Sequence, residues 1–217
     1  MARSQFFDRD LKLALSETMG PEAMARELAA FSRANLAEYL ATEADPPGYE
    51  TFVNGRRGAL EDSVRVPGPI VYQFNWWVQI LEYAMAYLRG RSPKGDGTGH
   101  KGRKAYRDSF FVLHDGRERH PRQWSLIPPD AEEVIITNDA PYHRKIDVQL
   151  AGGKRLRITV APGIMEDGAA AIEARFGGIV KARRIYTTPH SGQWIYQRGR
   201  RAGKPVDSPA IVLTPWG

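Results

Sequence analysis

Apolar residues recur at helical spacing near the start of the chain. Four of them share one side of a helix over residues 21–40: Met24, Leu28, Phe31 and Tyr39. Pro21 suits the first turn of such a helix, because its fixed φ is already helical and its missing N–H is not needed there. The proline-rich stretch 44–48 then ends it. The pattern therefore predicts an N-terminal helical region within residues 1–45.

The most apolar segment runs from Pro69 to Leu88, between a proline and Gly90. That asymmetry is typical of helix ends and predicts one long aromatic-rich helix. One apolar stripe comprises Ile70, Phe74, Trp77, Leu81, Met85 and Leu88, and a second, rotated stripe comprises Trp76, Ile80, Tyr83 and Tyr87. A helix with two apolar stripes must be covered on two sides. We expect the first stripe in the core and the second in a subunit interface, since interfaces favour Trp and Tyr.

Beyond this segment the pattern changes to short runs rich in β-branched and aromatic residues. Strands are predicted at 51–53, 106–113, 134–136, 156–160, 179–187, 193–196 and 210–213, with a short helix at 163–176. Asn54-Gly55 and Asp115-Gly116 predict tight turns. Residues 91–104 and the basic stretch 198–204 are predicted to be loops that become ordered on assembly. This order of elements favours an α+β fold with a mostly antiparallel sheet packed against the long helix and shorter helices, with extended arms.

Composition limits the number of domains and the kinds of site that the chain can form. Its 217 residues fit one domain, 1–217, with the helical region 1–45 and a basic C-terminal extension 198–217. Cysteine is absent, which excludes disulfides and thiolate metal sites. Polar residues inside 69–88, such as Gln73, Asn75 and Glu82, argue against a membrane span. The net charge of +6 permits contact with nucleic acid or an acidic protein face without demonstrating either.

Candidate chemistry is sparse. The glycine-rich stretch 95–102 lacks the Lys-Ser/Thr ending of a phosphate-binding loop and follows a helix instead of a strand. His114, Asp115, Glu118 and His120 are residue types that a metal-dependent nuclease uses, but their spacing fits no known ligand motif. The aromatic residues of the long helix have few basic neighbours, which disfavours stacking on nucleic-acid bases. No catalytic, cofactor or metal site is predicted.

Three groups of residues carry a resemblance to a known family. The first pairs the turn Asn54–Gly58 with Gly68–Phe74, which opens the aromatic segment. The second is the run Ser92, Pro93, the glycines at 97 and 99, Tyr106 and Ser109, followed by Asp115-Gly116. The third is Ile135–Tyr142, containing Asn138, Pro141 and Tyr142 and followed by Ile146-Asp147, with His143 where a small residue is usual. Together they resemble the phage neck or tail-completion (head–tail connector) proteins over about residues 54–176.

The resemblance implies a structural virion protein that forms a homo-oligomeric ring between the head connector and the tail. Its expected neighbours are connector or portal-side proteins and tail tube or terminator proteins, with DNA passing through the ring without sequence-specific binding. It implies no enzymatic activity, no cofactor and no membrane, and assembly into virions in the host cytoplasm. Two alternatives stay open: a tail terminator or head-closure protein of the same stack, and a basic DNA-binding or DNA-processing protein built around His114 and Glu118.

Overall fold

The chain divides into two compact units, residues 1–75 and residues 76–217, where the sequence analysis treats 1–217 as one domain. The structure is a computed structural model, and it describes residues 20–93, 105–151, 154–155, 160–188, 195, 200 and 202–216. Helices and antiparallel sheets occur together, so the predicted α+β class is confirmed. The division between the units falls at Trp76, inside the segment for which the sequence predicts an unbroken helix.

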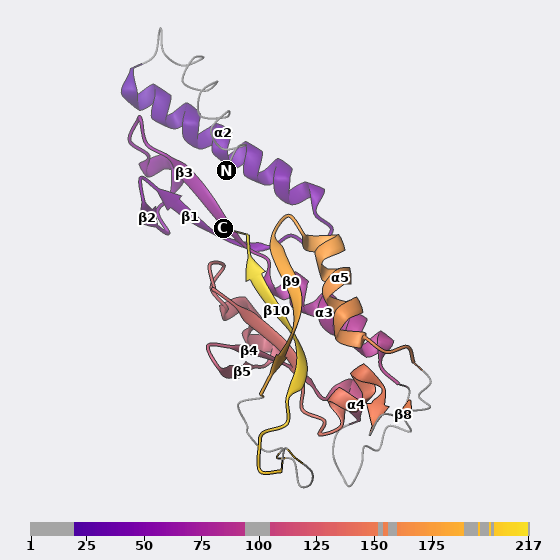
Figure 1. Cartoon of the computed structure of the whole chain (residues 1–217). Coiled ribbons are helices and arrows are strands. Elements are labelled where there is room, and N and C mark those ends of the chain that lie inside the picture. The colour runs from indigo at the N-terminus through magenta and orange to yellow at the C-terminus, as the bar shows by residue number, and fades with distance from the viewer. Residues whose placement is uncertain are drawn as a thin grey trace. The chain divides into compact units, whose positions relative to one another are not determined.

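The first unit, residues 1–75, places one long helix and a 3₁₀ turn beside a small antiparallel sheet (Figure 1). Its elements are helix α2 (Pro21–Thr42), strand β1 (Gly48–Val53), strand β2 (Arg56–Arg57), 3₁₀ helix η1 (Glu61–Ser63) and strand β3 (Ile70–Asn75). The strand order is β2-β1-β3. The predicted N-terminal helix and the predicted extended segment at 51–53 are confirmed.

A two-residue turn joins β1 to β2. Asn54 and Gly55 both have positive φ, 51° and 76°, which a tight hairpin requires and which Asn-Gly adopts readily. The Asn54 N–H donates to the Pro69 carbonyl at 2.9 Å, so the turn also holds the start of β3. A Cβ on Gly68 would lie 2.4 Å from Oδ1 of Asn54 and 2.4 Å from the Arg65 carbonyl oxygen. The turn and Gly68-Pro69, paired in the resemblance, are thus in direct contact.

The strands of the first unit present an aromatic face to the helix. The Tyr39 ring of α2 lies 4.7 Å from the Phe74 ring of β3, between centroids. The Tyr72 hydroxyl, also on β3, donates to Oε1 of Glu61 at 3.0 Å. The buried apolar side chains described in this unit are few and mostly small: Ala29, Leu36, Pro47, Val53 and Val64.

The second unit, residues 76–217, is built on a five-stranded antiparallel sheet of order β5-β4-β6-β10-β9. Its strands are β4 (Phe110–His114), β5 (Arg117–Arg119), β6 (Val134–Asn138), β9 (Val180–Thr187) and β10 (Ser208–Pro215), with a separate pair β7 (Leu150–Ala151) and β8 (Lys154–Arg155). Its helices are α3 (Trp77–Arg91), α4 (His143–Val148) and α5 (Ile164–Phe176), and its 3₁₀ helices are η3 (Tyr106–Asp108) and η4 (Pro121–Leu126).

The prediction of one helix from Pro69 to Leu88 is wrong in its first third. Residues 70–75 form β3, which pairs with β1 from Val53↔Ile70 to Gly48↔Asn75, and the helix begins only at Trp77. Pro69 therefore precedes a strand and does not open a helix. The apolar run suits both structures, because Ile, Val, Tyr and Phe fit a pleated surface as well as a helix. Pairing with a strand distant in sequence decides the outcome.

The core of the second unit lies between one face of the sheet and two helices (Figure 1). Val112, Ile136 and Ile211 stand opposite one another on neighbouring strands and face this core. From α3 come Trp77, Leu81, Met85 and Leu88, and from α5 come Ile164, Met165 and Ile172. Gly168 of α5 permits close approach, since a Cβ there would lie 2.9 Å from Cδ2 of Leu88 and 3.0 Å from Cδ1 of Ile211.

Residues 208–215 form a strand of the sheet. The prediction that 198–217 is a C-terminal extension is therefore wrong for these residues. β10 lies between β6 and β9, and the six residues from Ser208 to Leu213 are all buried. The predicted strand at 210–213 is confirmed and longer. Two prolines fit this central strand because Pro209 lies beyond its pairing with β6 and Pro215 ends it.

The remaining predictions fall into two groups. The strands at 134–136 and 179–187, the helix at 163–176 and the Asp115-Gly116 turn are confirmed, whereas 106–108 is a 3₁₀ turn preceding β4. The loop 94–104, the strand residues 156–159 and most of 193–196 lie outside the described residues, as do parts of 198–204.

Within the described part of the chain, no helix combines the length and apolar character that crossing a membrane requires.

Candidate functional site

Four of the motif residues proposed from the sequence lie around a buried histidine at one end of the five-stranded sheet: Tyr106, Ser109, Asn138 and Tyr142. The Tyr106 hydroxyl lies 2.9 Å from Nδ1 of His143, and Nε2 of the same ring lies 2.9 Å from the Pro209 carbonyl oxygen. A carbonyl oxygen can only accept, so Nε2 carries the proton and Nδ1 accepts from Tyr106. His143 is 0% exposed. The three groups form a closed hydrogen-bond chain from η3 through α4 to β10, which we call the histidine hub.

The hub occupies the place where two neighbouring strands separate. Pairing between β6 and β10 runs from Val134↔Leu213 to Ile136↔Ile211 and ends there. The Pro209 carbonyl lies just beyond and accepts from two side chains, Oγ1 of Thr137 at 2.9 Å and Nε2 of His143. Because a buried carbonyl without a partner is costly, these side chains replace the missing ladder bonds.

Burial controls protonation at the hub. Loss of hydration lowers the pKa of His143 to about 4, against smaller opposing effects of Asp147 and the Pro209 carbonyl. The ring is therefore neutral at pH 7, as its two hydrogen bonds require. Burial, followed by the charge of Asp147, also raises the pKa of Tyr106, which keeps the hydroxyl protonated as a donor.

Asn138 and Ser109 hold the chain segments around the hub. The Asn138 side chain donates from Nδ2 to the Tyr106 carbonyl at 2.8 Å and accepts from the Ala140 N–H at 2.8 Å. The Ser109 hydroxyl donates to the Ala105 carbonyl at 2.9 Å, and the Ser109 carbonyl accepts from the Asp139 N–H at 2.9 Å. These bonds join the approach to β4 with the end of β6.

A buried ion pair lies one helical turn beyond the histidine. Asp147 accepts from Nη2 of Arg184 at 2.6 Å and from the Met165 N–H at 2.9 Å, while its own carbonyl accepts from the Gly163 N–H at 2.8 Å. Met165 is in the first turn of α5, whose free N–H groups and dipole favour a carboxylate. Asp147 therefore connects α4, α5 and β9, although its side chain is fully buried.

Four of the seven motif residues proposed from the sequence thus share one neighbourhood. Tyr106, Ser109, Asn138 and Tyr142 meet there, and the Tyr106 and Tyr142 rings stack at 6.2 Å between centroids. Pro141 directly precedes Tyr142, and both are half-buried. Ser92 ends α3, where its hydroxyl donates to the Leu88 carbonyl at 2.7 Å, and Pro93 follows it. Sequence analysis included Thr137 in the run Ile135–Tyr142 without giving it a role, and it missed Arg184 and Pro209, because partners so distant in sequence leave no local pattern.

The predicted interface stripe is only partly at the surface. Ile80 is 1% exposed inside the core, so it cannot contact a second subunit directly, and its assignment to the interface is wrong. Trp76 is partly buried and packs against the core. Tyr83 and Tyr87 remain half-exposed on α3, 6.3 Å apart between ring centroids. The guanidinium of Arg175, at the end of α5, lies 4.7 Å over the Tyr83 ring.

The alternative site around His114 and Glu118 does not form. Leu113 pairs with Glu118 and His114 pairs with Arg117, so His114 and Glu118 project from opposite faces of the sheet. His114 is buried, and its nearest carboxylate oxygen, on the exposed Asp115, lies 3.5 Å from Nδ1. The residues that the structure describes contain no group of three or more His, Cys, Asp or Glu side chains placed to hold a metal ion.

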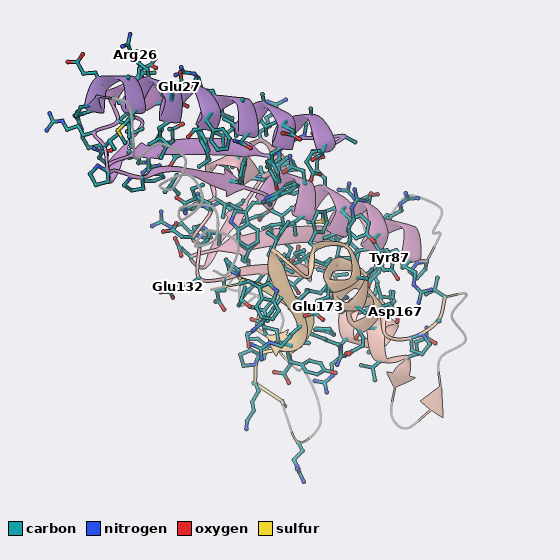
Figure 2. The ribbon with its side chains drawn as sticks, turned by 90° about the horizontal axis from the view of Figure 1, so that it is seen from above. Arg26, Glu27, Tyr87, Glu132, Asp167 and Glu173 are labelled. Carbon is teal, nitrogen blue, oxygen red and sulfur yellow. The ribbon has the colours of Figure 1, made fainter. Side chains whose placement is uncertain are left out.

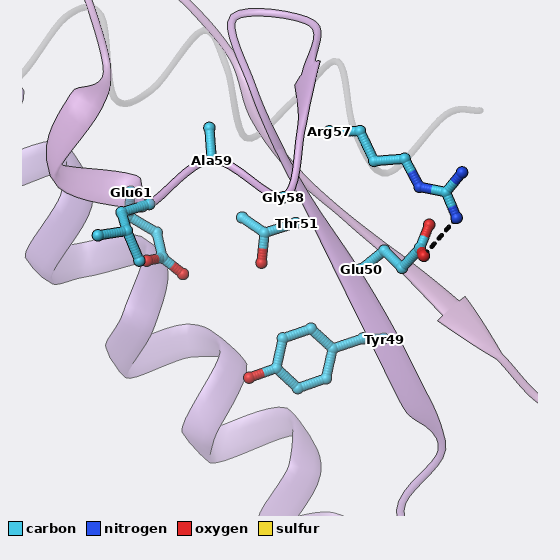
Figure 3. A pocket seen from close by; sticks show the side chains of 8 residues that line it. Tyr49, Glu50, Thr51, Arg57, Gly58, Ala59 and Glu61 are labelled. Atoms are coloured by element: carbon cyan, nitrogen blue, oxygen red, sulfur yellow. Dashed lines mark hydrogen bonds and ion pairs between the residues drawn. The ribbon is translucent and has the colours of Figure 1, made fainter.

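A pocket of about 460 Å³ opens in the first unit, between β1 and the chain leading into η1 (Figure 3). Its charged side chains already have partners within the unit. Arg57 donates to Oε1 of Glu50 at 2.5 Å, and Glu61 accepts from the Tyr72 hydroxyl. We infer no ligand for this pocket.

No protein-family profile, no curated protein and no solved structure matches the chain.

Proposed function

We propose that the chain is a ring-forming subunit of the neck that joins a phage head to its tail, acting as a structural protein and not as an enzyme. One observation supports this most directly. Four of the seven motif residues of the resemblance, drawn from separate stretches of sequence, lie around one buried hub.

The hub itself supports a structural role for those residues. Its histidine is neutral and fully buried, and both ring nitrogens are engaged. Groups in this condition position the backbone and do not meet a substrate.

Assembly into a ring needs a surface that contacts the next subunit. We assign that role to Tyr83 and Tyr87 with Arg175, since partly exposed Tyr side chains beside an exposed Arg are typical of interface hot spots. Figure 2 shows Tyr87 among the side chains of this unit. Head-to-tail contacts of this kind close into rings when the rotation between subunits permits.

The interface is tested by charge substitution. Tyr83→Glu and Tyr87→Glu should leave a folded subunit that fails to form rings, because a carboxylate there loses the ring contacts and must be desolvated in the interface. Arg89→Glu, on the far side of the same helix and exposed, is the matched control and should assemble normally. Light scattering of the purified variants measures the assembly state. Normal ring formation by both tyrosine variants would remove this interface from the proposal.

The function is tested in the phage. Without the chain, lysates should contain DNA-filled heads and finished tails that fail to join, because each part assembles on its own pathway. Loss of the Tyr142 ring should have the same effect, while His114→Ala with Glu118→Ala should leave infectivity nearly intact. Electron micrographs of the lysates provide the measurement. Empty heads, or salt-sensitive binding of the lone subunit to arbitrary duplex DNA, would instead support a DNA-processing protein.

A further inference from the structure

Strand β9 forms one edge of the five-stranded sheet and is long for an edge strand. It pairs with β10 along its whole length, from Val180↔Pro215 to Thr187↔Ser208, and it is the last strand on that side. The strand at the opposite edge, β5, has three residues where β9 has eight. Natural proteins usually shorten or cover an edge because its free N–H and C=O groups invite another strand.

The register shows which backbone groups of β9 face away from the sheet. The Trp216 N–H donates to the Ile179 carbonyl at 3.0 Å, which makes Val180↔Pro215 a pair without direct hydrogen bonds. Alternation then turns the N–H and C=O groups of Ala182, Arg184 and Tyr186 outward. Within the described part of the chain, the backbone amides of Arg184 and Tyr186 have no hydrogen-bond partner. The Tyr186 side chain is 46% exposed and the Arg184 side chain is partly exposed.

One outward amide is already occupied by a carboxylate. Oε1 of Glu173, on α5, accepts from the Ala182 N–H at 3.1 Å. Figure 2 labels this residue on α5. The carboxylate occupies the position that the carbonyl oxygen of an added strand would take. It therefore blocks the Ala182 N–H and leaves the N–H groups of Arg184 and Tyr186 available for pairing.

The charges along β9 select the kind of strand that can be added. Lys181 and Arg183 are exposed on the face opposite α5, while the Arg184 guanidinium is engaged by Asp147 on the helix side. A second copy of β9 is disfavoured. Antiparallel pairing centred on Ala182 sets Arg183 opposite the Lys181 of the second copy, and pairing centred on Arg184 sets two arginines opposite each other.

We propose that the β9 edge from Ala182 to Tyr186 binds an extended segment of another protein that alternates acidic and apolar residues. Its backbone completes the hydrogen bonds of Arg184 and Tyr186, its carboxylates face Lys181 and Arg183, and its apolar side chains lie beside the Tyr186 ring. Entry of the segment displaces Glu173 from the Ala182 N–H. This inference does not depend on the proposed neck function.

The test titrates the isotope-labelled full chain with an end-blocked peptide of alternating valine and glutamate. Hydrogen exchange followed by NMR should show new protection of the Arg184 and Tyr186 amides, with the already paired amides of Arg183 and Ile185 unchanged. A peptide of alternating valine and lysine is the charge control and should not bind. Equal binding of the two peptides, or protection elsewhere, would overturn the proposal.

Three variants test whether the β9 edge is the binding surface. Tyr186→Pro removes an outward donor that β10 does not use and should weaken the acidic peptide roughly tenfold, whereas Tyr186→Phe keeps the donor and should bind as the wild type does. Glu173→Ala frees the Ala182 N–H and should strengthen binding several-fold. If Tyr186→Pro binds as well as Tyr186→Phe, or if Glu173→Ala does not strengthen binding, the edge is not the binding surface. The glutamate variant keeps the test decisive should the proline variant fold poorly.

Discussion

At the scale of single residues, His143 illustrates how burial converts an ionisable side chain into a structural one. Its ring accepts from Tyr106 and donates to Pro209, which only the neutral tautomer protonated on Nε2 can do. The ring reaches the Pro209 carbonyl and closes the gap between β6 and β10.

The depressed pKa of His143 predicts an acid-sensitive fold. The folded pKa is about 4 and the unfolded pKa about 6.5, so the unfolded state binds the proton more tightly. The stabilisation is therefore complete above about pH 6.5 and is lost as the pH falls toward 4, with a total on the order of 3 kcal/mol. Urea unfolding between pH 7 and pH 4 measures this loss.

The matched variant for this experiment is His143→Gln, whose amide can donate to Pro209 and does not titrate. It should be less stable than the wild type at pH 7, because Gln fits the aromatic surroundings less well. Between pH 7 and pH 4 this variant should lose less stability than the wild type does, and the difference should equal about the His143 contribution. Parallel pH profiles of the two proteins would show that the histidine does not control acid stability.

At the scale of elements, the approach of α5 to α3 and β10 depends on Gly168. Leu88 and Ile211, whose methyl groups a Cβ would touch, are both 0% exposed and have little room to move. Arg91, at the end of α3, also forms an ion pair with Asp167 of α5. The three elements therefore meet at one small residue, and the packing there tolerates no added methyl group without adjustment.

Gly168→Ala should lower the free energy of unfolding by roughly 1–2 kcal/mol. Overpacking costs about 1–3 kcal/mol, and the better helix propensity of Ala returns at most about 1. Gly90→Ala is the control, because Gly90 is also helical but has no heavy atom within 4 Å of an added Cβ. That variant should be neutral or slightly more stable. Urea unfolding compares the two, and a Gly168 variant as stable as the Gly90 variant would contradict the close packing.

At the scale of the whole molecule, the second unit has a core of its own. Every residue of the main apolar cluster lies between Trp77 and Leu213, within residues 76–217. The described part of the first unit buries five apolar side chains: two valines, an alanine, a leucine and a proline. Small cores seldom stabilise a domain alone.

We therefore expect a fragment of residues 76–217 to fold by itself, with the near-ultraviolet circular dichroism of its buried Trp77 and Trp124. Urea should unfold it in one cooperative transition. A fragment of residues 20–75 should show helical signal without cooperative unfolding. A disordered 76–217 fragment would mean that its core depends on the remaining residues.

The candidate site was predictable in part. Tyr106, Ser109, Asn138 and Tyr142 were singled out by the resemblance, and they do meet in space. Ile80 was wrongly assigned to the subunit interface. Helical spacing indicates which residues share a side of a helix, but the elements that pack against that side decide whether it is buried. Arg184 and Pro209 could not be found, since their partners, Asp147 and His143, are each more than 30 residues away in sequence.

The sequence by itself determined those features that depend on neighbouring residues. The helices at 21–42 and 164–176, the Asn54-Gly55 and Asp115-Gly116 turns and the alternating strands all follow from local backbone preferences and apolar spacing. Tertiary structure alone decided that 70–75 is a strand, that 208–215 lies inside the sheet and that His143 is neutral. In each of these cases the deciding energy is a backbone hydrogen bond or a loss of hydration supplied by residues distant in sequence. A local sequence pattern does not indicate such partners.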